Sequence, residues 1–459
     1  MTTTISVIGT GYLGATHAAC MAELGFAVIG VDTDPAKIAD LSAGRLPFYE
    51  PGLPELLRAH TDGGALRFTT SIAEAADADV HFLCVGTPQR ADGLGADTTH
   101  VRAAVAGLVP HLRRDALIVG KSTVPVGTAH ELQAVADALA PEGVRVEIAW
   151  NPEFLREGRS VEDTLRPDRL VLGVTSEAAE QTLRTVYKRA IGAGTPVVVT
   201  DLVSAELVKV SANAFLATKI SFINAVAELC EATGGDVTDV SRALGHDARI
   251  GHAFLKAGLG FGGGCLPKDI RAMMARAGEL GVDQALTFLR EVDDINMRRR
   301  HRVVEMATDE LGGSLLGRRV AVLGAAFKPL TDDVRDSPAL NVAAQLQLRG
   351  AQVRVYDPQA MDNARAVFPT LAYADSAADA LAGADLVLLL TEWSEFLELD
   401  PAQAGDLVAQ RRVIDGRNAL DTDAWRRAGW SYRGLGRPRM EPIVESAAPV
   451  AATELELVG

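Results

Sequence analysis

The 459-residue sequence is poor in cysteine, in positive charge and in long apolar runs, and each shortage excludes a class of protein. Its four cysteines are scattered without the spacing of a disulfide framework or a metal site, which fits a reducing compartment and predicts no bound metal. No run of about 18 apolar residues is present, so no membrane span is expected. With 45 Lys and Arg against 60 Asp and Glu, the formal net charge is −15. A surface so acidic repels a polyanion, which argues against nucleic acid as a partner. The first residues lead almost directly into an apolar strand, which leaves no room for a signal peptide, and we expect a cytoplasmic protein.

Short apolar runs alternate with longer helix-like stretches in the first part of the chain. The runs contain five to seven residues and lie at 5–9, 26–32, 79–85, 116–120 and 144–150. Such runs are typical of buried parallel strands with helices between them. The alternation predicts a doubly wound α/β domain, which we place at residues 1–200.

The pattern changes after residue 200. From Val203 to Thr233 there is no Gly or Pro, and apolar residues recur at helical spacing until Gly234 and Gly235. A helix of about 31 residues would be about 46 Å long, longer than most domains are wide. Such a helix usually joins domains or pairs with a copy of itself. We therefore predict a central helical and dimerisation region at residues 201–310, and a homodimer or higher homo-oligomer.

The last third of the chain repeats features of the first. Residues 319–327 (RVAVLGAAF) resemble residues 5–12 (ISVIGTGY), and further segments of the first domain have counterparts at 353–358 and 384–392. This repetition predicts a second Rossmann-like domain at residues 311–440. The predicted fold class is therefore α/β, with two doubly wound Rossmann-like domains joined by a long central helix.

Two local patterns complete this outline. In the second domain, Ser337 suits the N-cap of a helix, Pro338 its first residue and Gly350 the position past its end. Residues 441–459 show no clear period and are expected to form a loose tail.

A glycine-rich turn follows the first predicted strand and opens a helix. In the segment GTGYLG, Gly9 permits the tight turn, Gly11 the close approach of a pyrophosphate and Gly14 the close packing of helix on strand. The start of the helix presents free N–H groups to the phosphates. Asp32 ends the second strand, where it would accept hydrogen bonds from the adenosine ribose and repel a 2′-phosphate. These features predict NAD rather than NADP as cofactor, although a strand-to-helix turn of this kind can also be purely structural. The candidate contacts are Gly9, Gly11, Tyr12, Leu13, Gly14 and Asp32.

Three further side chains are candidates for the same crevice. Thr87 and Thr123 follow later strands, whose carboxyl ends should complete it, although either could cap the next element instead. Lys37 could lie near the adenosine or be a solvated surface lysine.

The most unusual composition is found in the segment GLGFGGGCLPKD, residues 258–269. Five of the seven residues before Cys265 are glycine, so the backbone can approach a ligand closely. Pro267 suits the first residue of a helix, which places Cys265 at or near its N-cap. The positive end of that helix and Lys268 should lower the pKa of the thiol and favour the thiolate. Cys265 is therefore the candidate nucleophile, whereas the other three cysteines are expected in the core.

Polar residues elsewhere could serve the same site. Lys209 and Asn213 are four apart on one face of the long helix, where they could hold a developing oxyanion and a water, or be solvated. Glu153 and Glu157 follow the strand that ends at Trp150. They are a candidate base and a candidate cofactor contact, with two surface glutamates as the alternative.

Together and in this order, the motifs resemble those of the UDP-glucose 6-dehydrogenase family, within the wider nucleotide-sugar dehydrogenases. The match runs from Ile5 to about Arg417 and is carried by GTGYLG, KSTVPVGT, NPEFLREG, ELVKVSANAFLA, FLKAGLGFGGGCLPKD, AFK and IDGRN. The resemblance implies two successive hydride transfers, which convert a sugar C6 alcohol to a carboxylate with two NAD.

The resemblance also implies a role for each residue near the reacting carbon. Cys265 would attack the C6 aldehyde to give a thiohemiacetal, and loss of hydride would leave a thioester. Lys209 and Asp269 would polarise or deprotonate the oxygen. Asn213 and Thr123 would position it with an ordered water, and Glu153 would assist proton transfer.

The remaining implied contacts divide between cofactor and substrate. Glu157 and Arg335 would face NAD, and Arg249 would reach a neighbouring subunit's site. The implied contacts to the nucleotide-sugar are Glu153, Phe154, Leu155, Arg156, Lys209, Asn213, Arg249, Phe254, Leu255, Lys256, Gly262, Lys328 and Arg417. The cations in this set lie where a diphosphate needs them on a chain of net charge −15.

The sequence departs from the family at one position and leaves several activities open. Gly264 stands where the family often has serine, which should affect loop stiffness more than reaction type. UDP-glucose is the favoured substrate, with GDP-mannose or a UDP-N-acetylhexosamine as alternatives, because sugar choice depends on pocket shape. A two-electron 3-hydroxyacid dehydrogenase shares the first domain and the Lys–Asn pair but lacks the cysteine loop and the carboxy-terminal repeat. A non-catalytic NAD-binding protein is the alternative from another class.

Overall fold

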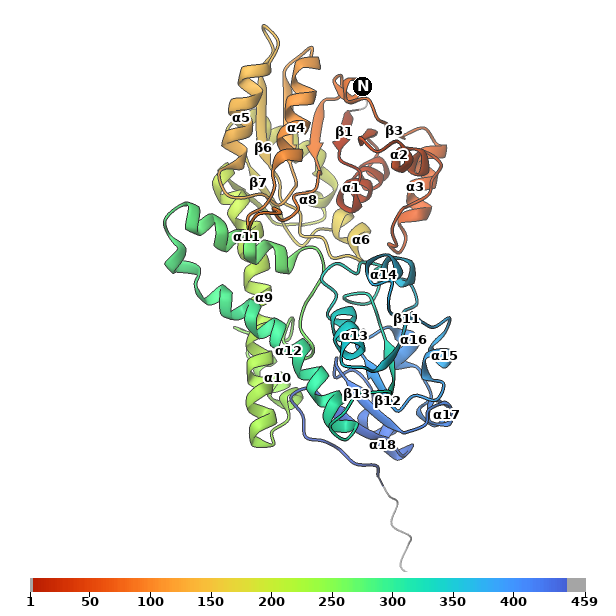
Figure 1. Cartoon of the computed structure of the whole chain (residues 1–459). Coiled ribbons are helices and arrows are strands. Elements are labelled where there is room, and N and C mark those ends of the chain that lie inside the picture. Colours follow the sequence, from red (N-terminus) through yellow and green to blue (C-terminus); the bar gives the residue numbers. More distant parts are fainter. Residues whose placement is uncertain (1–2, 444–459) are drawn as a thin grey trace, which may run out of the picture.

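Two α/β domains lie at opposite ends of a long helix in the computed structural model, which describes residues 3–443 (Figure 1). Most of the predicted tail, residues 444–459, lies outside the described residues. The predicted fold class is confirmed, because both domains contain a mainly parallel sheet with helices packed around it.

The first sheet has eight strands in the order β3-β2-β1-β4-β5-β6-β7-β8. Its strands are β1 (Thr4–Ile8), β2 (Ala27–Val31), β3 (Leu66–Thr69), β4 (Val80–Leu83), β5 (Ala116–Gly120), β6 (Val146–Trp150), β7 (Leu170–Gly173) and β8 (Val197–Thr200). All neighbours pair in parallel except β6 and β7. The five strands predicted from apolar runs are confirmed to within two residues at each end.

Helices enclose both faces of this sheet and bury two apolar clusters against it. They are α1 (Tyr12–Glu23), α2 (Pro35–Ser42), α3 (Leu53–Asp62), α4 (Thr99–Leu108), α5 (Thr128–Leu139), α6 (Ser160–Leu165), α7 (Glu177–Val186) and α8 (Lys188–Gly192). The carboxyl ends of β1, β2, β4 and β5 open on the side of the glycine turn, which is where a ligand binds in an open α/β sheet.

Helix α9 (Leu202–Thr233) confirms the predicted long helix. Asp201 caps its start by accepting a hydrogen bond from Ser204 N at 2.8 Å, and Gly234 ends it in the left-handed region. By length and composition, α9 is the one described helix that could cross a membrane, but it carries buried polar residues and packs against α11 and α12.

The remaining helices of the central region pack on α9. They are α10 (Val237–Gly245), α11 (Leu266–Glu279) and α12 (Phe288–Glu310). Ala214 and Ala217 of α9, Ile270 of α11 and Leu289 of α12 share one apolar cluster with Phe261 of the glycine-rich loop. The loop that holds Cys265 is therefore fixed on a rigid three-helix platform.

The second sheet repeats the topology of strands β1 to β6 of the first, with the order β11-β10-β9-β12-β13-β14. Its strands are β9 (Arg319–Leu323), β10 (Gln352–Tyr356), β11 (Ala372–Tyr373), β12 (Leu386–Leu389), β13 (Arg412–Asp415) and β14 (Ser431–Gly434). Its helices are α13 (Pro338–Leu348), α14 (Met361–Val367), α15 (Ala377–Leu381), α16 (Ser394–Leu397), α17 (Pro401–Leu407) and α18 (Thr422–Arg427). The predicted helix boundary is also confirmed, since the Ser337 hydroxyl accepts a hydrogen bond from Leu340 N.

Candidate active site

The glycine turn after β1 has the shape that a dinucleotide needs. Gly9 adopts a φ of 89°, and a Cβ at Gly14 would lie 1.7 Å from the Gly9 carbonyl oxygen. A Cβ at Gly11 would meet nothing within 4 Å, so the turn is open on that side. A pyrophosphate can therefore approach the backbone at the start of α1, and the residues present fit NAD.

Asp32 lies beside this turn at the end of β2. Its carboxylate accepts hydrogen bonds from Thr10 N at 2.9 Å and from Lys37 Nζ at 2.9 Å. Burial alone would raise the pKa of Asp32, but these bonds and the charge of Lys37 outweigh it and lower the pKa. The charged, partly exposed carboxylate is suited to ribose hydroxyls and would repel a 2′-phosphate. Lys37 is held by Asp32 rather than free in solvent.

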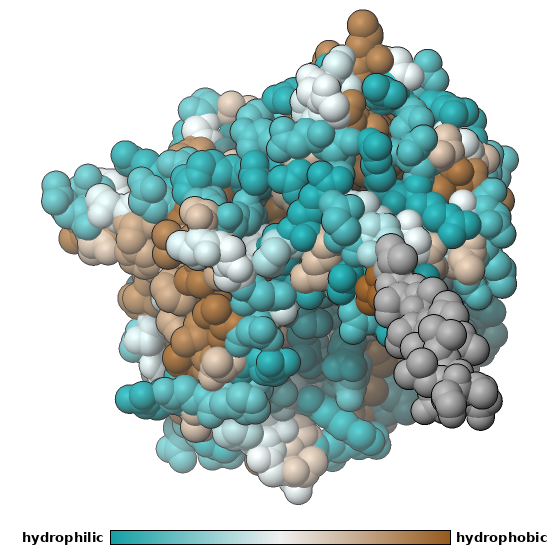
Figure 2. Space-filling model, turned by 90° about the horizontal axis from the view of Figure 1, so that it is seen from below, coloured by the Kyte–Doolittle hydropathy of each residue, from teal (hydrophilic) through white to brown (hydrophobic). Residues whose placement is uncertain are grey.

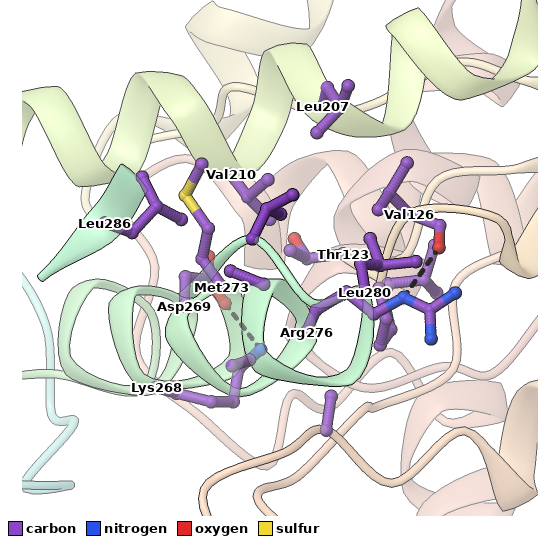
Figure 3. Close-up of a pocket in the computed structure, with 16 residues that line it drawn as sticks. Thr123, Val126, Leu207, Val210, Lys268, Asp269, Met273, Arg276, Leu280 and Leu286 are labelled. Atoms are coloured by element: carbon purple, nitrogen blue, oxygen red, sulfur yellow. Dashed lines mark hydrogen bonds and ion pairs between the residues drawn. The ribbon is translucent and has the colours of Figure 1, made fainter. Parts of the chain in front are cut away.

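The two predicted threonines come together across neighbouring strands. The Thr87 hydroxyl donates to the Thr123 carbonyl oxygen at 2.6 Å. Thr123 and Asp269 also line one largely apolar cavity of about 120 Å³ between α9 and α11 (Figure 3). The cofactor domain and the cysteine helix therefore meet at Thr123.

Cys265 is the N-cap of α11, as predicted, although Leu266 rather than Pro267 is the first helical residue. It is the exposed one of the four cysteines, and the other three are buried as expected. The predicted low pKa is wrong for this state of the protein. The thiol lies near Glu153, Asp269 and Lys209, and we call this cluster, together with Asn213, the recess. Desolvation by the surrounding protein and the Glu153 and Asp269 carboxylates raise the pKa of Cys265 to about 12.

Lys268, expected to favour the thiolate, and Lys209, the other ammonium near the thiol, are both already paired. Lys268 Nζ donates to Asp269 Oδ1 at 2.6 Å, so its charge is balanced one residue away. Lys209 Nζ lies 2.9 Å from Glu153 Oε1. Sequence position alone could not reveal these pairings, which explains why the prediction for the thiol failed.

Lys209 and Asn213 are buried in the recess and not solvated. Burial would lower the pKa of Lys209, but Glu153 and Cys265 raise it, and the side chain stays charged. Asn213 Nδ2 donates to Asp269 Oδ2 at 2.6 Å. An acid, an amide, an ammonium and a thiol from α9, α11 and the segment after β6 therefore face one another, which suits addition to a carbonyl and stabilisation of the resulting oxyanion.

Glu157 lies where the two α/β domains meet. It accepts a hydrogen bond from Thr331 Oγ1 at 2.9 Å and lies 3.5 Å from the Arg335 guanidinium. Burial and the nearby Asp333 raise the pKa of Glu157 to about 7. The Lys328 ammonium donates to the Glu157 carbonyl oxygen, so residues predicted for cofactor and for substrate converge at this junction.

Gly264 also bears on this junction. A Cβ at Gly264 would lie 2.3 Å from the central carbon of the Arg335 guanidinium. The absence of a side chain therefore does more than relax the loop, because it makes room for Arg335 beside Cys265.

The other predicted substrate residues are distributed unevenly. Arg417 is partly buried, and its guanidinium donates to the carbonyl oxygens of Leu390, Gly260 and Phe327 at 2.7 to 3.1 Å. A Cβ at Gly262 would lie 2.4 Å from the Asp336 carbonyl oxygen. Both residues close the glycine-rich loop onto the second α/β domain.

Three predicted substrate residues between positions 249 and 256 are exposed at the surface. Phe254 has a φ of 62° and is exposed, as is Lys256, whereas Leu255 between them is buried. Arg249 is exposed and pairs with Asp247 of its own chain at 2.6 Å. These side chains are available to a ligand or a second subunit.

The segment after β6 lies against the same recess. Lys209 and Arg169 both lie over the Phe154 ring, and the Leu155 N–H donates to Glu153 at 2.6 Å. Arg156 is tied to Asp163 by its side chain and its backbone N–H.

Two positioning residues are not recognisable as such from the sequence. Glu50 is buried and accepts hydrogen bonds from Tyr12 OH and from the N–H groups of Gly158 and Ser160, which holds the cofactor turn against the segment of Glu157. Glu206 of α9 accepts from Gly127 N and Ala129 N, both at 2.7 Å, and so caps α5. Burial raises the pKa of Glu206 to about 7. In the sequence, the one sign of this role is that Glu206 lies one turn before Lys209 on the predicted helix. Its partners cannot be recognised, because they are the backbone N–H groups of Gly127 and Ala129, far away in the sequence.

Arg276 reinforces the same turn from α11. Its Nε donates to the Val126 carbonyl oxygen at 3.0 Å (Figure 3). The turn that contains Thr123 is therefore held by charged side chains from both α9 and α11.

Known proteins of one family resemble this chain over most of its length. Three domain models of the UDP-glucose/GDP-mannose dehydrogenase family match it: the NAD binding domain at residues 3–191, the central domain at 203–298 and the UDP binding domain at 321–422. A UDP-glucose 6-dehydrogenase of Pseudomonas aeruginosa is 41% identical, covering 97% of this chain and 100% of that one.

Two solved structures are similar along nearly the full length. A UDP-glucose dehydrogenase from Pyrobaculum islandicum is 39% identical, with a TM-score of 0.87 and coverage of 95% of this chain and 98% of that one. A UDP-N-acetylmannosamine dehydrogenase from Pyrococcus horikoshii is 26% identical, with a TM-score of 0.82 and coverage of 95% and 99%.

Proposed function

The chain belongs to the UDP-glucose/GDP-mannose dehydrogenase family of NAD-dependent oxidoreductases, and we propose that it oxidises the C6 alcohol of UDP-glucose to the carboxylate of UDP-glucuronate. The observation that carries the proposal is the recess, in which the Cys265 thiol lies close enough to Glu153, Asp269 and Lys209 for their charges to shift its pKa. A simple alcohol dehydrogenase needs no such thiol, whereas oxidation of an aldehyde through a covalent adduct does.

The choice of UDP-glucose over its sister substrates rests on similarity. The two UDP-glucose enzymes described above are 41% and 39% identical, against 26% for the UDP-N-acetylmannosamine enzyme. GDP-mannose and UDP-N-acetylhexosamines remain the alternatives within the same four-electron chemistry.

The residues of the glycine turn hold the cofactor, which accepts a hydride in each of the two oxidations when it is bound. Gly11 and the start of α1 receive the pyrophosphate, and Asp32 receives the adenosine ribose. The part of the cofactor that extends toward Cys265 would contact Thr87, Thr123, Glu157 and Arg335. The adenosine end would contact Lys37, Tyr12 and Leu13.

In the first oxidation, Lys209 and Asp269 act on the C6 oxygen. Asp269, held by Asn213 and Lys268, accepts the hydroxyl proton directly or through water. The Lys209 ammonium stabilises the developing oxyanion, since Glu153 keeps it charged.

In the second oxidation, the thiol adds to the aldehyde carbon to form a thiohemiacetal, which becomes a thioester. Because the thiol pKa is about 12 in this structure, the thiol must lose its proton as it adds. Glu153 is placed to accept that proton and later to activate the water that hydrolyses the thioester. Asn213 and Thr123 position that water.

We place the nucleotide-sugar between the central region and the second α/β domain. Lys328 and Arg417 face the diphosphate and uridine end, and the loop from Phe254 to Gly262 encloses the ligand. This arrangement keeps the predicted division into residues 1–200, 201–310 and 311–440.

The homodimer also remains a proposal, supported by an exposed apolar stripe on α9. Phe215, Phe222 and Leu229 are 67%, 57% and 66% exposed and follow one another at intervals of seven residues, the spacing at which one helix face meets another. In a view from below, apolar side chains gather on the side of the central helices (Figure 2). A Phe222→Asp variant should be monomeric by light scattering if this stripe is the interface.

The decisive experiment is a stoichiometry measurement with purified enzyme. Two NADH should form for each UDP-glucose consumed, and a ratio of one would eliminate the thioester scheme. Cys265→Ala should form no acid, whereas the matched control Cys230→Ala, which changes a buried cysteine of α9, should retain turnover. A parallel screen with GDP-mannose and UDP-N-acetylmannosamine tests the choice of sugar.

A further inference from the structure

A small cavity lies next to Glu153 inside the first α/β domain. Its space for water molecules is about 40 Å³, and its walls include Glu153, His17 of α1, Lys121 after β5 and Asp168 before β7. A buried water needs at least about 10–15 Å³ of such space. The cavity therefore has room for more than one water molecule.

His17 is the unusual member of this wall. The side chain is buried, packs edge-on against Phe82 with ring centroids 4.5 Å apart, and has no hydrogen-bond partner for Nε2 among the described residues. Burial, and then the charge of Lys121, lower the pKa of His17, so the ring is neutral. A buried ring nitrogen without a partner is costly, and a water in the adjoining cavity is the partner that the geometry allows.

Three other polar residues of the wall bond to one another. Lys121 Nζ donates to Asn151 Oδ1 at 2.9 Å, to Asn151 O at 3.3 Å and to Tyr187 OH at 3.4 Å. Tyr187 OH in turn donates to Asn151 Oδ1 at 2.6 Å. Of the wall groups, His17 Nε2 is therefore left without a partner. Glu153 already pairs with Lys209 and accepts from Leu155 N, but its carboxylate oxygens can each accept a further hydrogen bond from water, as can the exposed Asp168 at the rim.

The proposed function creates a need for such water, and the inference rests on it. Alcohol oxidation by NAD⁺ yields an aldehyde, NADH and one proton. Addition of the thiol and a second oxidation yield the thioester, NADH and another proton. Hydrolysis consumes one water, restores the thiol and releases the carboxylate with a third proton. Glu153 receives protons in the last two stages and must lose them before the next turnover.

We propose that the cavity holds ordered water anchored by His17 Nε2, and that this water carries protons from Glu153 to bulk solvent past Asp168. Protons then leave Glu153 by a route separate from the recess that binds the sugar. His17 is a positioning residue in this route, because it acts on the water and touches neither sugar nor cofactor.

The first test does not depend on the substrate. A high-resolution crystal structure of the wild-type chain should contain an ordered water within hydrogen-bond distance of His17 Nε2, and the His17→Leu variant should lack it. A dry cavity in the wild type would overturn the inference even if UDP-glucose proves to be the substrate. An enzyme inactive on UDP-glucose with a hydrated cavity would count against the proposed function alone.

The second test blocks the route from a neighbouring helix. Thr164 lines the cavity from α6, and Thr164→Met should fill it. With whichever sugar nucleotide the wild type oxidises, this variant should lose about tenfold in kcat. This is less than the roughly hundredfold lost when a catalytic acid or base is itself removed, because Glu153 stays in place. Its solvent deuterium isotope effect should increase, and both KM values should stay within about twofold of the wild type.

The matched control is Thr185→Met. Thr185 bonds to the backbone carbonyl four residues earlier, as Thr164 does, but is exposed on α7. It should behave as the wild type does. A Thr164→Met enzyme with wild-type kcat and isotope effect would overturn the inference.

Discussion

The second Rossmann-like sheet has the strand order of β1 to β6 in the first, but the aspartate after the second strand has a different environment in each domain. In the first, Asp32 is partly exposed and bonds to Thr10 and Lys37 beside an open glycine turn. In the second, Asp357 is buried and accepts from the N–H groups of Ala325 and Ala326 and from Trp393 Nε1. One fold thus uses the same carboxylate as a ligand contact in one domain and as an internal brace in the other.

The glycine turns differ in the same direction. Gly11 of the first turn corresponds to Ala326 of the second, whose methyl group is buried. A side chain at this position, and an acid already occupied by backbone N–H groups, mean that this turn cannot hold a dinucleotide in the way the first turn can. The comparison teaches that topology makes a site possible, while a few contacts decide whether a ligand can use it.

The largest effect should come from removing the two acids in turn. Asp357→Ala should lower the free energy of unfolding by about 3 kcal/mol or more, because it leaves several buried donors without an acceptor. Asp32→Ala should cost about 1 kcal/mol or less but should erase most of the preference for NAD over NADP. Urea unfolding and kcat/KM for both cofactors measure the pair. Equal losses of stability would break the contrast.

The next effect should appear at the glycine turn. Gly11→Ala should raise KM for NAD about 100-fold without loss of stability, because the added methyl group touches only the ligand. Ala326→Gly is the control in the second domain, where NAD kinetics should not change and stability should fall by about 1 kcal/mol. An unchanged KM in Gly11→Ala would mean that the pyrophosphate lies elsewhere.

A smaller effect on stability should distinguish the bonds that hold each α/β domain to the central helical region. After its fifth strand, the first domain is held by the titratable Glu206, and the second by a backbone bond from Leu259 N to Gly416 O at 2.9 Å. Folding raises the pKa of Glu206 to about 7. The stability that this shift contributes is complete below the unfolded pKa and is lost as pH rises through about 7. The free energy of unfolding of Glu206→Gln, minus that of the wild type, should therefore rise by about 2 kcal/mol between pH 5 and pH 8. A difference that does not vary with pH would contradict this assignment.

The smallest effect should arise where the second domain reaches the first. Gly264→Ser should displace the Arg335 guanidinium and weaken its pairing with Glu157. Because Arg335 is largely exposed, KM for NAD should rise by about threefold, with kcat little changed. Initial-rate kinetics test this, and a large fall in kcat would mean that residue 264 acts on Cys265 itself.

Much of the fold and several site residues could be predicted from the sequence. The strands, the 32-residue α9 and the repeated sheet follow from apolar runs and from Gly and Pro positions, because these signals are local. The cap at Cys265 followed from Pro267 for the same reason. The protonation of its thiol could not, because the carboxylates of Glu153 and Asp269 approach it from other elements.

By itself, the sequence determined the two α/β repeats, the long helix between them and the residue types gathered for dehydrogenase chemistry, because periodicity and turn chemistry act over a few residues. Only the tertiary structure decided which charges meet. It paired Lys209 with Glu153 and Lys268 with Asp269, turned Asp357 inward and set His17 beside a cavity. The physical reason is that electrostatic and hydration energies depend on distances in space between segments far apart along the chain.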